Sequence, residues 1–160
     1  MSTEIQRTFL LLKPDAILRA LIGVILNEFE QKGFRISAMR MLFLNDELLY
    51  GLYPFLPERA FHDQVKSSMQ CAPCVAFVLE GRNAIKRAFE LAGPEKKSEE
   101  NPAYTIRGKY SMWTGADVIH RAATYEEAET QISMFFGSDI CEYQRLDGMF
   151  LSETGWRQRA

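Results

Sequence analysis

The sequence predicts an α+β fold in which a four-stranded antiparallel sheet is covered by helices. The first observation is the order of the segments, whose apolar patterns alternate between strand and helix as β-α-β-(αα)-β-α-loop-β-α. Without the inserted pair of helices this order is βαββαβ, the ferredoxin-like arrangement, and we expect the helices on one face of the sheet. The second observation is the length of 160 residues, which suits one domain with a sizeable core.

The first predicted strand is a short, continuously apolar run over residues 8–12, which is typical of a central strand. Because proline cannot continue a central strand, Lys13-Pro14-Asp15 places Lys13 at the end of this strand. A lysine in that place either extends its charged end into solvent or binds an anion. The segment by itself favours neither interpretation.

The elements that follow are predicted from apolar periodicity and capping residues. In order, we expect a helix over 21–29 closed by Gly33, a strand over 34–44, a helix over 48–53 capped by Asn45, a helix over 57–69, a strand over 73–79, and a helix from Asn83 to Leu91. The polar stretch over 95–104 is predicted to be a loop. A loop of this length in a compact domain is often functional.

The last strand and helix surround His120, one of two histidines in the chain. Val118 and Ile119 are β-branched and predict a short strand with His120 at its exit. Thr124 is a suitable N-cap for a helix that runs to about Phe136. A neutral imidazole has a free lone pair, so His120 can serve as nucleophile, base or ligand. Taken alone, a packed or solvated histidine is the commoner case.

Composition limits the classes of partner. The net charge of -2 predicts no general affinity for nucleic acid or for an anionic membrane. No apolar run approaches the ~20 residues that span a bilayer, and the polar N-terminus has no signal-peptide pattern, so we expect a cytoplasmic protein. Cys71 and Cys74 have redox or metal-binding spacing, but no second pair exists and Cys74 opens a buried strand. We therefore interpret this pair as structural.

Several motifs now coincide in one order: Arg7-Thr8-Phe9-Leu10-Leu11-Leu12-Lys13-Pro14-Asp15, Phe29-Glu30-Gln31-Lys32-Gly33-Phe34-Arg35, Val78-Leu79-Glu80-Gly81, Asn83-Ala84-Ile85-Lys86, Ala92-Gly93-Pro94, Thr105-Ile106-Arg107-Gly108 and Val118-Ile119-His120. Together they closely resemble the nucleoside diphosphate kinase family, from about Arg7 to Phe136. We therefore expect a kinase-like domain over residues 1–136. The tail over 137–160 is expected to pack on that domain or on a neighbouring subunit.

The resemblance implies a ping-pong reaction in which a nucleoside triphosphate phosphorylates His120 and a nucleoside diphosphate then takes the phosphate. It implies that Lys13 contacts the phosphates and ribose, that Arg107 binds phosphate, that Tyr53 lies beside the histidine, and that Phe61 stacks on the base. Stacking tolerates different bases, since every base has a π-face. The resemblance also implies Mg²⁺ held through the nucleotide phosphates, no protein metal cluster, and a homo-oligomer, either hexamer or tetramer.

The sequence departs from the family pattern close to the chemistry. An asparagine that meets the ribose hydroxyl and phosphate is replaced by Asp117, which still counts as a candidate nucleotide-binding residue. The other departures are Phe89 for a phosphate-binding arginine, Glu95 for a threonine, Ala116 for an arginine, Arg121 for a glycine and Gln131 for a glutamate. These changes mostly remove donors or add carboxylate, although Arg121 could compensate. Two functions stay open: an active kinase, or a weakened nucleotide-binding scaffold or regulatory domain.

Overall fold

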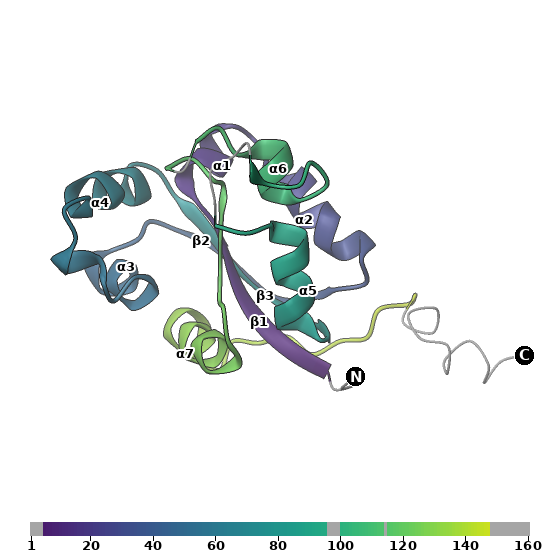
Figure 1. Ribbon diagram of the computed structural model, residues 1–160. Helices are drawn as coiled ribbons and strands as arrows, with labels where there is room; N and C mark the ends of the chain where they lie inside the picture. The colour runs from purple at the N-terminus through teal and green to yellow at the C-terminus, as the bar shows by residue number, and fades with distance from the viewer. Residues whose placement is uncertain (1–4, 96–99, 114, 148–160) are drawn as a thin grey trace, which may run out of the picture.

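The computed structural model describes residues 5–95, 100–113 and 115–147 of the chain (Figure 1). The elements run in the order β1 (Ile5–Leu12), α1 (Pro14–Leu18), α2 (Ile22–Gln31), β2 (Arg35–Leu42), α3 (Asp46–Leu52), a 3₁₀ turn η1 (Leu56–Glu58), α4 (His62–Gln70), β3 (Cys74–Arg82), α5 (Ala84–Ala92), α6 (Ile106–Tyr110), β4 (Ile119–Arg121) and α7 (Tyr125–Phe136).

The strands form one four-stranded sheet in the order β2-β3-β1-β4. Each neighbouring pair is antiparallel, and in β1 and β4 the residue Leu11 lies opposite His120. This sheet with its helices confirms the predicted α+β, ferredoxin-like fold. The register pairs the short strand β4 with the interior strand β1, so the backbone of His120 is held beside the centre of the sheet.

The helices cover both faces of the sheet, so the expectation of helices on one face is wrong. Phe9 and Leu11 of β1 pack with α3, α4 and α7, whereas Leu10 and Leu12 pack with α2 and α5. In Figure 1 the two sets of helices lie on opposite sides of the strands. The continuously apolar run in β1 already required this arrangement, because alternate side chains point to opposite faces and all four are fully buried. The inserted pair α3–α4 is therefore part of one cover and not an addition outside the fold.

Local capping signals were more dependable than element lengths. The side chains of Asn45 and Thr124 accept the N–H groups of Leu48 and Glu127, as an N-cap does. The helix predicted over 57–69 is instead interrupted, because Arg59 is extended between η1 and α4. Gly33 has φ +84° after α2, in keeping with its predicted role at the helix end.

Two short helices were not predicted, and one of them carries a candidate site residue. Helix α6 begins after Thr105, whose hydroxyl accepts the N–H of Gly108 at 3.0 Å. A Cβ added to Gly108 would lie 2.0 Å from the carbonyl oxygen of Pro102, so this close turn requires glycine. The helix places Arg107 in the interior. The other unpredicted helix, α1, follows Lys13 directly.

The first part of the tail follows the outer edge of β2. The N–H of Cys141 donates to the carbonyl oxygen of Ser37 at 2.7 Å, and the Tyr143 hydroxyl donates to the carbonyl oxygen of Ile36 at 2.7 Å. These bonds satisfy part of a sheet edge that would otherwise be unpaired. Residues 148–160, with Phe150 and Trp156, lie outside the described residues, so the packing of the whole tail stays a prediction. Among the described helices, none has the length and apolar character to cross a membrane.

Candidate active site around His120

His120 lies on β4 within a wall of rings. The Tyr53 ring meets it edge-on at 5.2 Å between centroids, and the Phe9 ring lies 6.3 Å away. The histidine is 5% exposed. Burial lowers its pKa to about 3, against the raising effect of a hydrogen bond to the Gln131 carbonyl oxygen, and the charges of Lys13 and Arg107 lower it further. The imidazole is therefore neutral at neutral pH, as a nitrogen nucleophile has to be.

Lys13 and Asp117 form an ion pair beside this histidine. Burial alone lowers the pKa of Lys13, but Tyr53 and Asp117 outweigh it and raise that pKa to about 12. The other oxygen of Asp117 lies 3.4 Å from Nε of Arg107. One carboxylate therefore lies between the two cations that the resemblance assigns to phosphate binding.

A tight turn brings Asp117 to this position. Val118 has φ +61°, which is rare for a β-branched residue, and it is not part of the strand as predicted. The Asp15 carboxylate accepts the N–H of Val118 at 3.2 Å, and the N–H of Ile119 donates to the Asp117 carbonyl at 2.8 Å. The turn replaces the strand alternation that would have separated Asp117 from His120, and Asp117 acts electrostatically on the histidine.

Arg107 is 1% exposed and tied to the backbone on both sides of the site. Its Nη1 donates to the carbonyl oxygen of Gly93 and its Nη2 to that of Ile119, each at 2.6 Å. The Glu95 carboxylate lies 3.7 Å from Nη2. A guanidinium has five N–H donors, so donors remain for an anion after these backbone bonds are made.

Arg121 approaches the same region from β4. Its guanidinium carbon lies 4.2 Å from the centroid of the Phe89 ring, and its exposure is 8%. Burial lowers its pKa, Glu95 raises it and Arg107 lowers it, so these three charged groups share one electrostatic environment. Among the described residues, Nε of Arg121 is buried without a hydrogen-bond partner.

Phe61 is the predicted residue that is not joined to this cluster. It precedes α4, its ring is 47% exposed, and none of the ring or polar contacts of the cluster in the described residues includes it. The neighbouring His62 bonds instead to the Tyr50 hydroxyl at 2.9 Å and to Asp63 at 2.8 Å. The two histidines are thus in separate environments.

Sequence reasoning missed Glu127. It lies one helical turn before Gln131 on α7, and the Gln131 amide donates to it at 2.9 Å. The spacing of four residues on a predicted helix was the available signal. Asp15, whose carboxylate accepts the N–H of Val118 and holds this turn, has no local sequence signal for that role beyond its place in the Lys13-Pro14-Asp15 motif.

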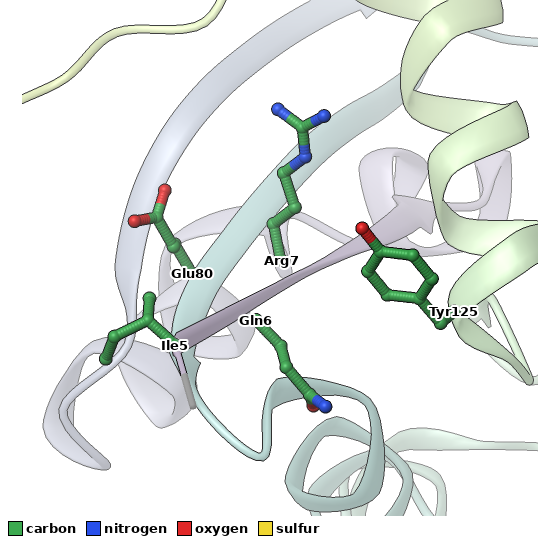
Figure 2. A pocket seen from close by; sticks show the side chains of 5 residues that line it. All are labelled: Ile5, Gln6, Arg7, Glu80 and Tyr125. Atoms are coloured by element: carbon green, nitrogen blue, oxygen red, sulfur yellow. The ribbon is translucent and has the colours of Figure 1, made fainter. Parts of the chain in front are cut away.

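Two hollows lie outside the cluster or at its border. Figure 2 shows the larger, about 560 Å³, lined by Ile5, Gln6, Arg7, Glu80 and Tyr125, none of which was predicted to act. Its arginine is already paired with Glu129 through two hydrogen bonds of 2.6 and 2.7 Å. The smaller, about 330 Å³, borders Lys13 between α1, α4 and the segment after α6.

In the described part of the chain, no group of three or more His, Cys, Asp or Glu side chains is placed to hold a metal ion.

Comparisons with known proteins agree with this geometry. The family model described as "Nucleoside diphosphate kinase" matches residues 6–140. The chain is 36% identical over 145 residues to a nucleoside diphosphate kinase of Gallus gallus, covering 90% of this chain and 94% of that one. It is 35% identical over 149 residues to that of Archaeoglobus fulgidus, covering 92% and 98%.

Solved structures give the same result. The halophilic nucleoside diphosphate kinase from Halobacterium salinarum, solved in complex with CDP, superposes with a TM-score of 0.88 at 29% identity, covering 94% of this chain and all of that chain (100%). The enzyme from Encephalitozoon cuniculi superposes with a TM-score of 0.86 at 31% identity, covering 92% and 99%. The family model and these relatives match nearly the whole chain, and the site has the neutral histidine among cations described above. This chain belongs to the nucleoside diphosphate kinase family.

Proposed function

We propose that this chain transfers the terminal phosphate of a nucleoside triphosphate to a nucleoside diphosphate through phosphorylated His120. The observation that supports this most directly is the buried, neutral imidazole next to Lys13 and Arg107. Phosphoryl transfer needs little covalent chemistry from a protein beyond a nucleophile, correct positioning and positive charge around the transferring oxygens. The nucleophile and the positive charge are present in the cluster, which supports the proposal.

The tautomer of the His120 imidazole determines which ring nitrogen reacts. Nε2 of His120 lies 3.1 Å from the Gln131 carbonyl oxygen, which only accepts, so Nε2 carries the proton. The Nδ1 lone pair then forms the bond to phosphorus. The bond from phosphorus to the bridging oxygen breaks, and its electron pair leaves with the nucleoside diphosphate. The second half-reaction reverses these changes with another diphosphate, and Nε2 keeps its proton throughout.

The other roles follow from the chemistry of each side chain. Lys13 and the remaining N–H donors of Arg107 would bind phosphate oxygens. The Tyr53 hydroxyl would donate beside His120, since burial raises its pKa and keeps it protonated. Phe61 would stack on the base with its exposed ring, and Asp117 would accept a hydrogen bond from a sugar hydroxyl.

Mg²⁺ would arrive on the nucleotide and be held by phosphate oxygens and water. The donors at the site fit this arrangement, because cationic groups there match phosphate and Asp117 is already occupied by Lys13 and Arg107. When bound, the ion neutralises part of the phosphate charge. The protein residues position the phosphates and the nucleophile.

Two further properties belong to the proposal. The edge strand β2 and the residue after it expose three large apolar side chains, Met39, Met41 and Phe43, which supports a homo-oligomer. The resemblance implies a tetramer or hexamer, and light scattering coupled to gel filtration tests the subunit number. The three cysteines are free thiols, in keeping with a cytoplasmic location.

Incubation with γ-labelled nucleoside triphosphate tests the proposal. We expect acid-labile, base-stable label on the protein, lost in His120→Ala and retained in His62→Ala. Nucleotide binding without label would favour the weakened scaffold, for which the carboxylate of Asp117 among the phosphate-binding cations is the supporting observation.

A further inference from the structure

A chain of hydrogen bonds continues behind His120 into helix α7. Gln131 faces Nε2 of the histidine with its carbonyl oxygen at 3.1 Å, and its amide nitrogen donates to one oxygen of Glu127 at 2.9 Å. The other oxygen of that carboxylate accepts the N–H of Ala123 at 2.9 Å. Gln131 is 1% exposed, so its amide is satisfied by these protein partners and not by solvent.

The carboxylate of Glu127 fixes which group donates and which accepts in each of these hydrogen bonds. An ionised carboxylate only accepts hydrogen bonds, so the group that Gln131 turns toward Glu127 has to be its NH₂. The carbonyl oxygen then faces His120, and it also only accepts. The proton of the neutral imidazole is therefore placed on Nε2, and the lone pair of Nδ1 is left free.

We propose that Glu127 is a positioning residue that acts through Gln131 to hold His120 in the tautomer with Nδ1 unprotonated. The family pattern expects a carboxylate at position 131, and in this chain a carboxylate lies one helical turn earlier and reaches the histidine through an amide. As the Nδ1–phosphorus bond forms, the ring becomes cationic while Nε2 stays protonated. A carboxylate that polarises the intervening amide stabilises that charge. The catalytic consequence rests on the proposed phosphotransfer, whereas the tautomer does not.

A purely structural role for Glu127 makes a different prediction. Its N–H donates to the Thr124 hydroxyl at 3.1 Å and its carboxylate accepts the N–H of Ala123, which resembles a capping box at the start of α7. In that role the residue would affect stability but not the protonation of His120. A substitution that separates the two roles therefore has to keep the helix cap at Ala123 and Thr124. It must remove only the requirement that Gln131 turn its NH₂ toward position 127.

Glu127→Gln meets this requirement. Its carbonyl oxygen can still accept from Ala123, while its NH₂ faces Gln131. The Gln131 amide then rotates to accept that hydrogen bond and presents its own NH₂ to Nε2 of His120, which moves the proton to Nδ1. The double variant Glu127→Gln/Gln131→Glu exchanges the two groups and returns a pure acceptor to Nε2. Thr124→Ala is the control, because it weakens the cap without touching the carboxylate–amide bond.

The measurement is ¹⁵N NMR of the two ring nitrogens of His120 at neutral pH, in full-length protein labelled at histidine, with His62 as internal reference. We expect an unprotonated Nδ1 in the wild type and in Thr124→Ala, a shift toward protonated Nδ1 in Glu127→Gln, and recovery in the double variant. Single-turnover phosphorylation by a nucleoside triphosphate should slow about tenfold or more in Glu127→Gln, the worth of roughly one hydrogen bond, at unchanged KM, and recover in the double variant. Glu127→Ala is a second test of the tautomer, since without the carboxylate the Gln131 amide is free to rotate.

The outcomes separate the two hypotheses. An unchanged tautomer in both Glu127→Gln and Glu127→Ala would overturn the positioning role even if the rate falls. A tautomer that shifts as expected supports that role even if the wild type takes no label, in which case only the proposed phosphotransfer fails. A tautomer that shifts equally in Thr124→Ala would assign the effect to the helix start and overturn the role of the carboxylate.

Discussion

The guanidinium of Arg121 is stacked on the ring of Phe89, with its carbon 4.2 Å from the ring centroid. The two residues come from β4 and α5, and both depart from the family pattern. A guanidinium that uses its face for an aromatic ring keeps its N–H groups, which lie in its plane, available for an anion. Arg121 is buried, and its charge interacts with that of Arg107. This geometry supports a role for Arg121 in binding phosphate, in place of the family arginine that is Phe89 in this chain.

Arg121→Ala should therefore weaken catalysis. A hydrogen bond to a charged group contributes ~1.5–3 kcal/mol, so its loss should lower kcat/KM by roughly ten- to hundredfold. Arg87→Ala is a matched control, since Arg87 lies on α5, the helix that carries Phe89, and its guanidinium donates to the carbonyl oxygen of Lys32 and stacks on Phe34 away from the site. Steady-state kinetics with a nucleoside triphosphate in excess measure both. Equal effects of the two variants would remove Arg121 from the phosphate site.

Phe61→Ala should weaken binding of all nucleoside diphosphates by a similar factor. Stacking is worth ~1–3 kcal/mol per base and hardly depends on the base. Isothermal titration with purine and pyrimidine diphosphates measures the loss. Strongly base-dependent losses would argue against a stacking role for this exposed ring.

The neutral imidazole of His120 predicts a loss of stability in acid. Its pKa is lowered by burial from 6.5 to about 3, so between these values the unfolded chain binds a proton that the folded chain does not. Stability is therefore complete above the unfolded pKa and decreases as the pH falls toward the folded pKa. Near pH 5 this group should cost ~2 kcal/mol relative to neutral pH.

Urea unfolding at neutral pH and near pH 5 checks this for the wild type and for His120→Asn. The variant should lose ~2 kcal/mol less than the wild type over that interval, because it has no proton to take up. His62→Asn is the control, since His62 is partly exposed. The same pH dependence in wild type and His120→Asn would contradict a strongly lowered pKa.

The order of elements was predictable from the sequence, because periodicity and capping residues such as Asn45 and Thr124 act locally. The continuously apolar run of β1 also indicates that both sheet faces are covered, because side chains on both sides of that strand are buried. The turn at Val118 was not predictable, since a β-branched residue with positive φ contradicts local preference and is held by the carboxylate of Asp15 from far along the chain.

Within the site, the residues that match the family motif could be named in advance, and the contacts that this chain makes in its own way could not. The stack of Arg121 on Phe89 depends on how closely α5 approaches β4. The role of Gln131 depends on which side of its amide faces Glu127. Both are tertiary relationships for which single residue types give no signal.

Asp117 is paired with Lys13 and lies 3.4 Å from Nε of Arg107. A carboxylate in this place engages two cations that a phosphate would otherwise bind. At ~5 Å and an effective dielectric of about 20, its repulsion of a phosphate charge is on the order of 3 kcal/mol before the paired cations reduce it. Asparagine would keep an acceptor for the sugar hydroxyl and for Lys13, and would add a donor.

Asp117→Asn should therefore raise kcat/KM by about tenfold, mainly through a lower KM, while lowering thermal stability because the ion pair with Lys13 is lost. Kinetics and thermal unfolding of this variant, of Arg121→Ala and of the double variant separate the contributions. Additive effects mean that Asp117 and Arg121 act on the phosphate independently, whereas a benefit of Asp117→Asn that disappears without Arg121 means that they act as a unit. A slower Asp117→Asn enzyme would show that the carboxylate is an adapted part of this site, holding Lys13 and Arg107 in the arrangement that the phosphate needs.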